Sequence, residues 1–278
     1  MVYDLVIIGG GASGLIASIF AKEINVCILE KNSRVGKKIL TTGNGRCNFT
    51  NRNIDIASYH SNNISFVSNV FKNFGLGETL DFFESIGIVP LELDEGKIYP
   101  ASLQASSVLD MLRYKAVSNG VNIITEFDAK SIQKKGNIFY VKSYDGKSVG
   151  ANNVIIATGG KTAPKSGSDG FGYKFAEKFG HKTTLLYPSL VQLKCPVKDV
   201  ISMKGIRFDG IAILNIDDVT VKSQHGEILF TEYGLSGPAI FQISGHASKA
   251  LEEGKNVECY LDIIPFMSLE NFIGNLMQ

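Results

Sequence analysis

The 278-residue sequence has no tryptophan, only four histidines and only four cysteines. The cysteines lie far apart in the sequence, at Cys27, Cys47, Cys195 and Cys259. They form no CxxC pair, and no histidine stands at a spacing typical of a zinc cage. We therefore expect reduced thiols and no metal site.

A strong net charge and a membrane-type segment are also missing. Lys and Arg total 28 against 27 for Asp and Glu, and the resulting net charge of +1 gives no long-range attraction to nucleic acid or anionic lipid. The apolar stretch over residues 5–20 contains four glycines, follows Asp4 and lacks a basic n-region, which argues against a signal peptide or a membrane span. We expect a cytoplasmic protein without a nucleic-acid or membrane partner.

A globular composition and a βαβ pattern are present. Hydrophobic residues make up 44% of the chain, which is long enough for one large domain or two ordinary ones. Residues 3–8 predict a buried strand, residues 12–22 an amphipathic helix and residues 26–29 a second buried strand. The protein therefore opens with a parallel βαβ unit.

The hydrophobic pattern changes along the chain. Helical patterns and further strand-like segments precede a boundary that we place at Tyr187–Pro188, and only short strand-like runs follow residue 189. We therefore predict an α/β protein with a Rossmann-like domain over residues 1–187 and a smaller, strand-rich domain over residues 188–278. The expected helices are 64–86, broken at Gly75 and Gly77, and 106–119, and the expected strands are 121–125, 138–143, 148–151, 154–157, 190–193, 211–216, 219–222 and 257–261.

The final residues, 268–278, have the pattern of a helix that has barely begun. Its apolar residues have no later segment to cover them, and they are Leu269, Phe272, Ile273 and Leu276. We therefore expect a chain that ends early, inside its second domain, and that aggregates or associates when isolated.

The motif Gly9-x-Gly11-x-x-Gly14 lies between the first strand and the first helix, and Glu30 ends the next strand. Gly9 permits a tight turn, Gly11 lets a pyrophosphate approach the backbone, and Gly14 lets the helix pack on the strand. Glu30 would accept hydrogen bonds from a ribose, which favours FAD or NAD over NADP. We include the neighbouring Ala12, Ser13 and Lys31 in the candidate cofactor site.

Two further segments fit a cofactor site. The loop GKKILTTGNGRCNFTN (36–51) can turn many backbone N–H groups toward an anion or a flat polar ring, although a surface loop with incidental lysines is the alternative. Thr158 and Gly159 follow a buried strand and would let a cofactor lie close to the backbone. For the glycine-rich segment 164–181 we favour an ordinary helix entry over a phosphate loop.

The chain resembles a known family in five segments: GGGASGL, GKKILTTGNGRCNFTN, EGKIYPASLQASSV, ATGGKTAPKSGSDGFGY and GEILFTEYGLSGPAIFQIS. They are similar to signatures of the bacterial FAD-dependent oxidoreductases that include aminoacetone oxidase-like and bile-acid-dehydroxylating, BaiN-like enzymes. The resemblance implies a Rossmann-like FAD domain interrupted by a partly β-barrel insert domain, and a returning segment that this chain lacks. The family's Phe-Thr-His motif reads Phe230-Thr231-Glu232 here, so we assign no catalytic acid or base.

The same resemblance implies roles for individual residues. Gly9, Gly11, Ser13, Gly14 and Glu30 would hold the adenosine and the pyrophosphate. The residues facing the pyrophosphate and the flavin would be Lys37, Lys38, Gly43, Asn44, Gly45, Arg46 and Cys47. Ala129 is a candidate near the adenine. For Cys47 a packing role is favoured over a redox role, because no second thiol is near in sequence.

The sequence therefore predicts an FAD-dependent oxidoreductase. NAD(P)H would deliver hydride to the flavin for reduction of a small organic substrate, or an amine would be oxidised with O2 as acceptor. No second GxGxxG follows a strand, so NAD(P)H would bind transiently over the flavin. The alternatives are a catalytically incomplete nucleotide-binding fragment that needs a further segment or partner, and an FAD-dependent RNA-modifying enzyme, which the neutral charge disfavours.

Overall fold

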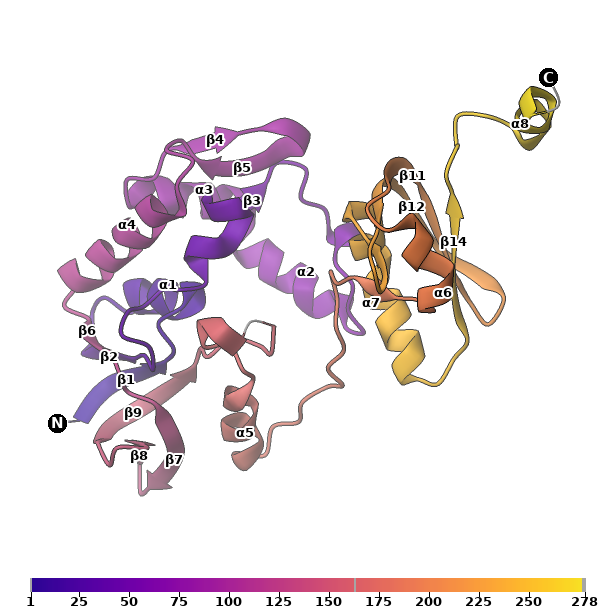
Figure 1. The fold of residues 1–278 in the computed structure, drawn as a ribbon. Coiled ribbons are helices and arrows are strands. Elements are labelled where there is room, and N and C mark those ends of the chain that lie inside the picture. The colour runs from indigo at the N-terminus through magenta and orange to yellow at the C-terminus, as the bar shows by residue number, and fades with distance from the viewer. Residues whose placement is uncertain (1, 163, 277–278) are drawn as a thin grey trace. The chain divides into compact units, whose positions relative to one another are not determined.

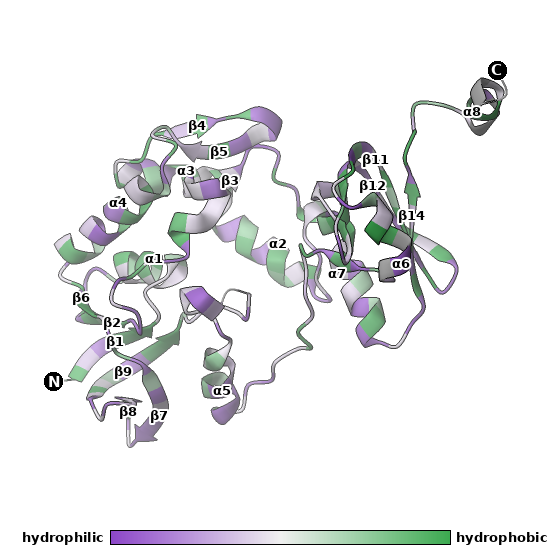
Figure 2. Ribbon diagram, viewed as in Figure 1, coloured by the Kyte–Doolittle hydropathy of each residue, from purple (hydrophilic) through white to green (hydrophobic). Residues whose placement is uncertain are grey.

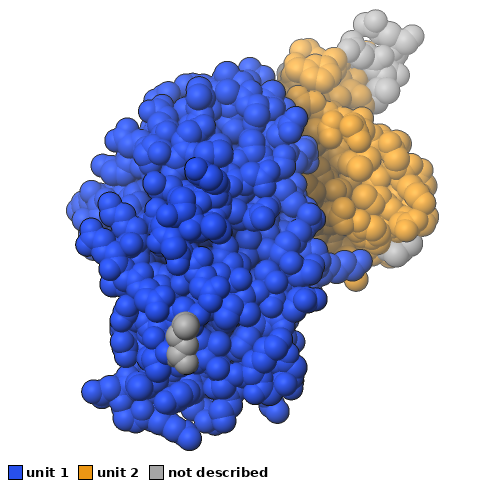
Figure 3. Space-filling model, turned by 90° about the vertical axis from the view of Figure 1, so that its left-hand side faces the viewer, with its two compact units in different colours: residues 1–183 blue, residues 184–278 orange. Residues whose placement is uncertain are grey.

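The computed structural model describes residues 2–162 and 164–276. The chain divides into two compact units, residues 1–183 and residues 184–278, which are coloured separately in Figure 3. The division falls four residues before the boundary expected at Tyr187–Pro188. Residues 181–192 contain no helix or strand, so no regular element marks the boundary in the sequence.

A six-stranded sheet forms the framework of the first unit, with the strand order β6-β2-β1-β9-β8-β7 (Figure 1). Four strands pair in parallel: β1 (Val2–Ile8), β2 (Val26–Leu29), β6 (Asn122–Ile124) and β9 (Ser148–Ile156). Two strands continue the sheet beyond β9 in antiparallel pairing: β8 (Ile138–Ser143) and β7 (Ala129–Lys135). The Rossmann-like framework is therefore as expected. However, β7 was not predicted, and β9 joins two segments that we expected to be separate strands.

Helices cover the parallel strands on one face. Ile7 and Ile28 point to this face and pack in one buried cluster with Leu15 of α1 (Ala12–Phe20) and Leu112 of α4 (Ala105–Ser118). Burial of such side chains contributes about 1.5–3 kcal/mol each. The alternation of side chains along a strand sends the neighbouring residues to the opposite face, so β1 and β2 must be apolar on both sides.

On the opposite face of the parallel strands, a second buried cluster includes residues of β7, β8 and α5 (Phe171–Lys178). Val6 and Leu29 share this second cluster with Phe127 and with Phe175 of α5. Both faces of β1 and β2 are therefore buried, and the backbone pairing of β1 with β2 and β9 fixes the ends of the three strands relative to one another.

Two helices and a small sheet complete the first unit. The helices α2 (Ile64–Asn73) and α3 (Leu76–Ser85) separate at Gly75 as expected, whereas Gly77 lies inside α3. Figure 2 shows α2 and α4 with alternating hydrophobic and hydrophilic bands, as expected for amphipathic helices. The remaining elements are β3 (Thr50–Asn51), β4 (Pro90–Glu92) and β5 (Lys97–Pro100), in the order β3-β5-β4, and 3₁₀ turns at Ile39–Gly45, Ile56–Ser58, Asp94–Gly96 and Pro164–Ser166.

The second unit is an antiparallel sheet with one long helix. The strand order is β10-β13-β12-β11-β14, and the strands are β10 (Leu193–Lys194), β11 (Arg207–Ile216), β12 (Val219–Phe230), β13 (Gly234–Ser236) and β14 (Val257–Asp262). Helix α7 (Pro238–Glu252) packs on the sheet through Ile240 and Ile243, which share a buried cluster with Leu214 and Ile228. The unit is strand-rich as expected, but α7 was not predicted.

Short elements lie at both ends of this unit. They are α6 (Val197–Val200), a 3₁₀ turn (Ile201–Met203) and α8 (Leu269–Leu276). Of the apolar residues predicted to be uncovered in α8, Phe272 and Ile273 are exposed. The side chains of Leu269 and Leu276 lie outside the described residues. Among residues 2–162 and 164–276, no helix combines the length and the apolar character that crossing a membrane requires.

Candidate nucleotide-binding site

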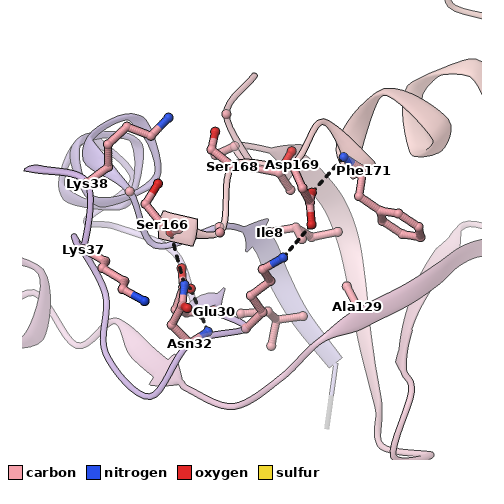
Figure 4. Close-up of a pocket in the computed structure, with 18 of the residues that line it drawn as sticks. Ile8, Glu30, Asn32, Lys37, Lys38, Ala129, Ser166, Ser168, Asp169 and Phe171 are labelled. Atoms are coloured by element: carbon pink, nitrogen blue, oxygen red, sulfur yellow. Dashed lines mark hydrogen bonds and ion pairs between the residues drawn. The ribbon is translucent and has the colours of Figure 1, made fainter. Parts of the chain in front are cut away.

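A pocket of about 530 Å³ opens at the carboxyl ends of β1, β2 and β9 (Figure 4). The chain leaves β1 toward β2 on one side, and β9 joins β1 on the other, so the strand order reverses at β1. Open parallel sheets bind ligands at such a position. The lining comes from the turns after all three strands, the loop after β2, residues 127–129 and residues 166–169.

The three glycines of the Gly9-x-Gly11-x-x-Gly14 motif have two different roles. Gly9 has a φ of +106°, and a Cβ there would lie 2.5 Å from the carbonyl oxygen of Ala157. At Gly14 a Cβ would lie 2.0 Å from the carbonyl oxygen of Gly9, so both positions require glycine for packing. A Cβ on Gly11 would meet no protein atom within 4 Å. The fold therefore does not require glycine at this position, which lines the pocket.

The N-terminus of α1 faces this pocket. The helix begins at Ala12, its N-cap is Gly11, and no side chain caps it. Ala12 and Ser13 line the pocket, so the uncapped N–H groups of the first turn are available to a ligand. Lys38 lies nearby, because its Nζ is 3.6 Å from the position of a Cβ on Gly159. The helix dipole and the ammonium together make this end of the pocket suitable for an anion.

Glu30 is held rigidly at the end of β2. Its side chain is 7% exposed. One carboxylate oxygen accepts a hydrogen bond from the backbone N–H of Gly10 at 2.8 Å. The other accepts from the backbone N–H of Asn32 at 2.8 Å and from the Asn32 side-chain amide at 2.6 Å. A carboxylate has about four lone-pair sites, and these three bonds leave room for one ligand hydroxyl.

Sequence reasoning missed one wall of the pocket. Residues 166–169 line it, although we expected an ordinary helix entry in this region. Asp169 accepts a hydrogen bond from the N–H of Phe171 at the start of α5, as Figure 4 shows, so the helix entry is present too. The Lys31 ammonium, 2.7 Å from Asp169, lowers the pKa of this carboxyl. The sequence signal for this wall is its glycines. Gly159, Gly167 and Gly170 all have positive φ in the structure, a conformation that favours glycine.

Apolar side chains complete the far end of the pocket. Phe127 is 2% exposed and sits beneath it, and Phe171 and Phe175 come from α5. Tyr144 contributes from the turn after β8. An apolar, aromatic lining with a few placed polar groups is typical of small-molecule sites.

The structure brings many of the predicted site residues together. The predicted residues that line this pocket are Gly9, Gly11, Ala12, Ser13, Glu30, Lys31, Lys37, Lys38, Ala129, Thr158 and Gly159. The predicted residues outside its lining are Gly14, Gly43, Asn44, Gly45, Arg46 and Cys47. Gly14 lies behind the turn, against Gly9.

The loop 43–47 turns away from the pocket after Thr42. Gly43 packs against Asn48 and the Tyr99 ring, and the Arg46 guanidinium lies 5.4 Å from the centre of that ring. Cys47 is 7% exposed and has a φ of +60°, which is unusual for a residue with a side chain. Burial raises the pKa of its thiol, a property of a packed cysteine rather than a reactive one.

Within the part of the chain that the structure describes, no group of three His, Cys, Asp or Glu side chains could hold a metal ion. The fold and the pocket define a Rossmann-like domain with a dinucleotide-type site. The chain belongs to the HI0933-like family, whose model, described as HI0933-like protein Rossmann domain, matches residues 3–234. This match confirms the family expected from the sequence.

Two curated relatives are enzymes by name. The chain is 41% identical over 265 residues to the 3-dehydro-bile acid delta(4,6)-reductase of Clostridium scindens, a match that covers 94% of this chain and 64% of the relative. It is 30% identical over 277 residues to the ribosomal RNA dihydrouridine synthase of Escherichia coli, covering 98% of this chain and 66% of the relative. The chain thus spans about two thirds of the length of these relatives.

Among solved structures, THI4 of Thermovibrio ammonificans is 17% identical to this chain. The match covers 56% of each chain, with a TM-score of 0.40.

Proposed function

We propose that the protein is an FAD-dependent oxidoreductase. The observation that carries this proposal is the arrangement of Gly11 and Glu30 at one pocket: an open approach to the backbone at the N-terminus of α1, and a fixed carboxylate at the end of β2. A pyrophosphate needs the first feature and an adenosine ribose needs the second. Membership of the HI0933-like family supports the same conclusion.

The residues of the pocket fit FAD. Gly11 leaves room for the pyrophosphate, which the first-turn N–H groups of α1 and the ammonium groups of Lys37 and Lys38 would bind. Glu30 would accept a hydrogen bond from a ribose hydroxyl and would repel a 2′-phosphate. The apolar side chains of Phe127 and Ala129 in the lining would suit an adenine ring.

When bound, FAD would supply hydride or electron transfer, and the protein would orient the cofactor and tune its surroundings. The described residues of this chain would hold the adenosine and pyrophosphate half. We assign no catalytic acid or base. In particular Glu232, in the Phe230-Thr231-Glu232 motif, is exposed and ion-paired with Lys204 at 2.7 Å, and this pairing lowers the pKa of its carboxyl.

The direction of the reaction is proposed from the relatives. A delta-reductase and a dihydrouridine synthase both add hydrogen to an unsaturated substrate, according to their names. We therefore favour reduction of a double bond in a small organic substrate over oxidation of an amine by O2. NAD(P)H would be the hydride donor and would bind transiently over the flavin.

Reduction of a uridine in ribosomal RNA is the second candidate. The specific observation in its favour is the 30% identity to the Escherichia coli synthase. The higher identity to the bile acid reductase and the net charge of +1, which provides no long-range attraction to RNA, favour the small molecule. A cytoplasmic setting suits either candidate, and the buried thiols Cys27 and Cys47 fit a reducing compartment.

Anaerobic turnover of the purified chain with added FAD tests the proposal. Bleaching of the flavin band by NADH or NADPH, followed by reoxidation on addition of a 3-oxo-Δ4,6 steroid acid, is expected. Reoxidation by unmodified ribosomal RNA alone, with dihydrouridine found after digestion, would select the second candidate. A chain that binds no FAD would contradict both candidates.

A further inference from the structure

One wall of the pocket is a segment tied to the loop after β2. The segment is residues 164–170, and we call it the clasp. Side chains of residues 31–37 reach it at three places, each across more than 125 positions of sequence. The contacts are Lys31 Nζ to Asp169 Oδ2 at 2.7 Å, Asn32 Nδ2 to the Ser166 carbonyl oxygen at 3.5 Å, and Lys37 Nζ to the Lys165 carbonyl oxygen at 3.1 Å.

Asn32 links the clasp to the ribose acid. The same amide nitrogen that donates to the Ser166 carbonyl donates to Glu30 at 2.6 Å, and Figure 4 shows the Asn32–Ser166 bond beside Glu30. A ligand hydroxyl that engages Glu30 therefore acts next to the group that holds the clasp. The group that holds the clasp and the carboxylate of the candidate ribose site are therefore in direct contact.

The clasp fits closely where it crosses the loop. Gly167 has a φ of +98°, and a Cβ there would lie 2.8 Å from Asn32 Nδ2 and 3.3 Å from Lys31 Cε. Only glycine lets the two segments approach this closely. Ser168 is 3% exposed and donates to the Gly160 carbonyl oxygen at 2.9 Å, which fixes the clasp to the turn after β9.

The contacts between clasp and loop are nevertheless weak individually. The Lys31 and Asp169 side chains are 35% and 43% exposed. Exposed ion pairs contribute little to stability, and salt screens them. The side of the clasp that faces the loop is held by such contacts and has positive-φ glycines at 167 and 170. It can separate from the loop without disrupting the core, while Ser168 stays bonded to Gly160.

We propose that the clasp closes over the bound dinucleotide. Lys31, Asn32 and Asp169 are positioning residues that set the rate at which the dinucleotide is released. This inference rests on the proposed FAD function. Lys31 and Asp169 act as a pair: the ammonium holds the clasp, and the clasp covers the adenosine half of the cofactor. Closure needs no change in the sheet, because the contacts that hold the clasp come from the loop after β2 and from the clasp itself.

Release of FAD from the loaded chain tests the pair. Holoprotein is diluted into excess ADP, which occupies the emptied site, and the rise of free flavin fluorescence gives the rate. Lys31→Met keeps the apolar stem against Gly167 and removes the charge. Asp169→Asn keeps an oxygen for the N–H of Phe171. Each is expected to speed release by about two- to fivefold, the range of an exposed ion pair.

The double variant decides whether the two residues act on each other. For a clasp, the double variant releases FAD no faster than the faster single variant. Additive rates would mean that Lys31 acts on the cofactor independently of Asp169, and would overturn the proposed pair. Asp110→Asn is the matched control, because Asp110 is an exposed partner of Arg113 on α4 and lies outside the pocket lining.

Amide hydrogen exchange tests the clasp even if FAD does not bind. The exchange of residues 164–170 is compared in the unliganded chain, in the presence of ADP, and in Asp169→Asn and Gly167→Ala. Protection by ADP and faster exchange in both variants are expected. Unchanged exchange in all three comparisons would overturn the clasp, whereas a chain that binds ADP but not FAD would overturn only the proposed function.

Discussion

The carboxylate of Glu30 and the backbone N–H of Gly10 are joined by a 2.8 Å hydrogen bond. This bond ties the end of β2 to the glycine turn after β1, across 20 positions of sequence. The residue that would read the ribose is therefore also part of the structure that shapes the pyrophosphate site. We therefore expect ligand affinity and local stability to depend on the same carboxylate.

Replacing Glu30 by alanine should weaken FAD binding by about 1–3 kcal/mol, because a ribose hydroxyl and the Gly10 N–H both lose an acceptor. Titration of the unliganded chain with FAD measures the affinity, and thermal unfolding in parallel shows how much stability is lost. Glu84→Ala, at an exposed position on α3, is the control. Equal affinities of Glu30→Ala and the unaltered chain would remove Glu30 from the ribose site.

Valine substitutions at two glycines of the same motif should have opposite consequences. Gly11→Val should leave the fold intact and abolish nucleotide binding, because its side chain would enter open space in the pocket. Gly14→Val should fail to fold, since its Cβ would meet the Gly9 carbonyl oxygen at 2.0 Å. Circular dichroism and ADP titration separate the two outcomes. Retained binding by Gly11→Val would show that the loop is only structural.

The flavin that the protein carries should be FAD and not FMN. The glycine turn and Glu30 provide for a pyrophosphate and an adenosine ribose, both of which FMN lacks. The cofactor released on denaturation is identified by chromatography before and after phosphodiesterase treatment. Stoichiometric FMN in the untreated sample would contradict the assignment of this pocket.

Stability should fall at alkaline pH because of the buried thiol of Cys27. Burial raises the pKa of this thiol from 9.0 to about 12. The unfolded chain loses the proton above pH 9 while the folded chain retains it, so this contribution is complete below pH 9 and is lost as the pH rises toward 12.

Urea unfolding at about pH 8 and about pH 10.5 measures this effect. The midpoint should fall more in the unaltered chain than in Cys27→Ala. The pKa values of the Cys47 and Cys259 thiols shift in the same direction, that of Cys259 to about 11, and their contribution cancels in the comparison. Equal falls in the two proteins would show that Cys27 does not titrate as the structure indicates.

The beginning of the fold could be predicted from the sequence because its signals are local. The apolar residues of β1 and β2, the glycine turn and Glu30 lie within the first 30 positions and specify one βαβ unit. Helix α7 was missed although Pro238 stands at its first position, a common helix start.

The clasp could not be predicted for a different reason. Its contacts pair Lys31 with Asp169, which are 138 positions apart, and no local pattern in a single sequence records such a pairing. The path of loop 43–47, which lies outside the pocket lining, depends on contacts of the same non-local kind. Glycines and asparagine showed that its backbone is unusual, but its direction depends on packing of Gly43 against Tyr99.

The central position of β1 has a consequence for how the protein is made. By residue 124 the nascent chain can form β6, β2 and β1, but the partner on the other edge of β1 is β9, which ends at Ile156. At about 5–20 residues per second, synthesis from position 124 to position 156 takes about 2–6 s. During this interval β1 is an open sheet edge, and no cofactor site yet exists to protect it. Flavin can therefore stabilise the completed unit but cannot guide its early assembly, so chaperone protection of this edge would act before flavin supply has any effect on yield.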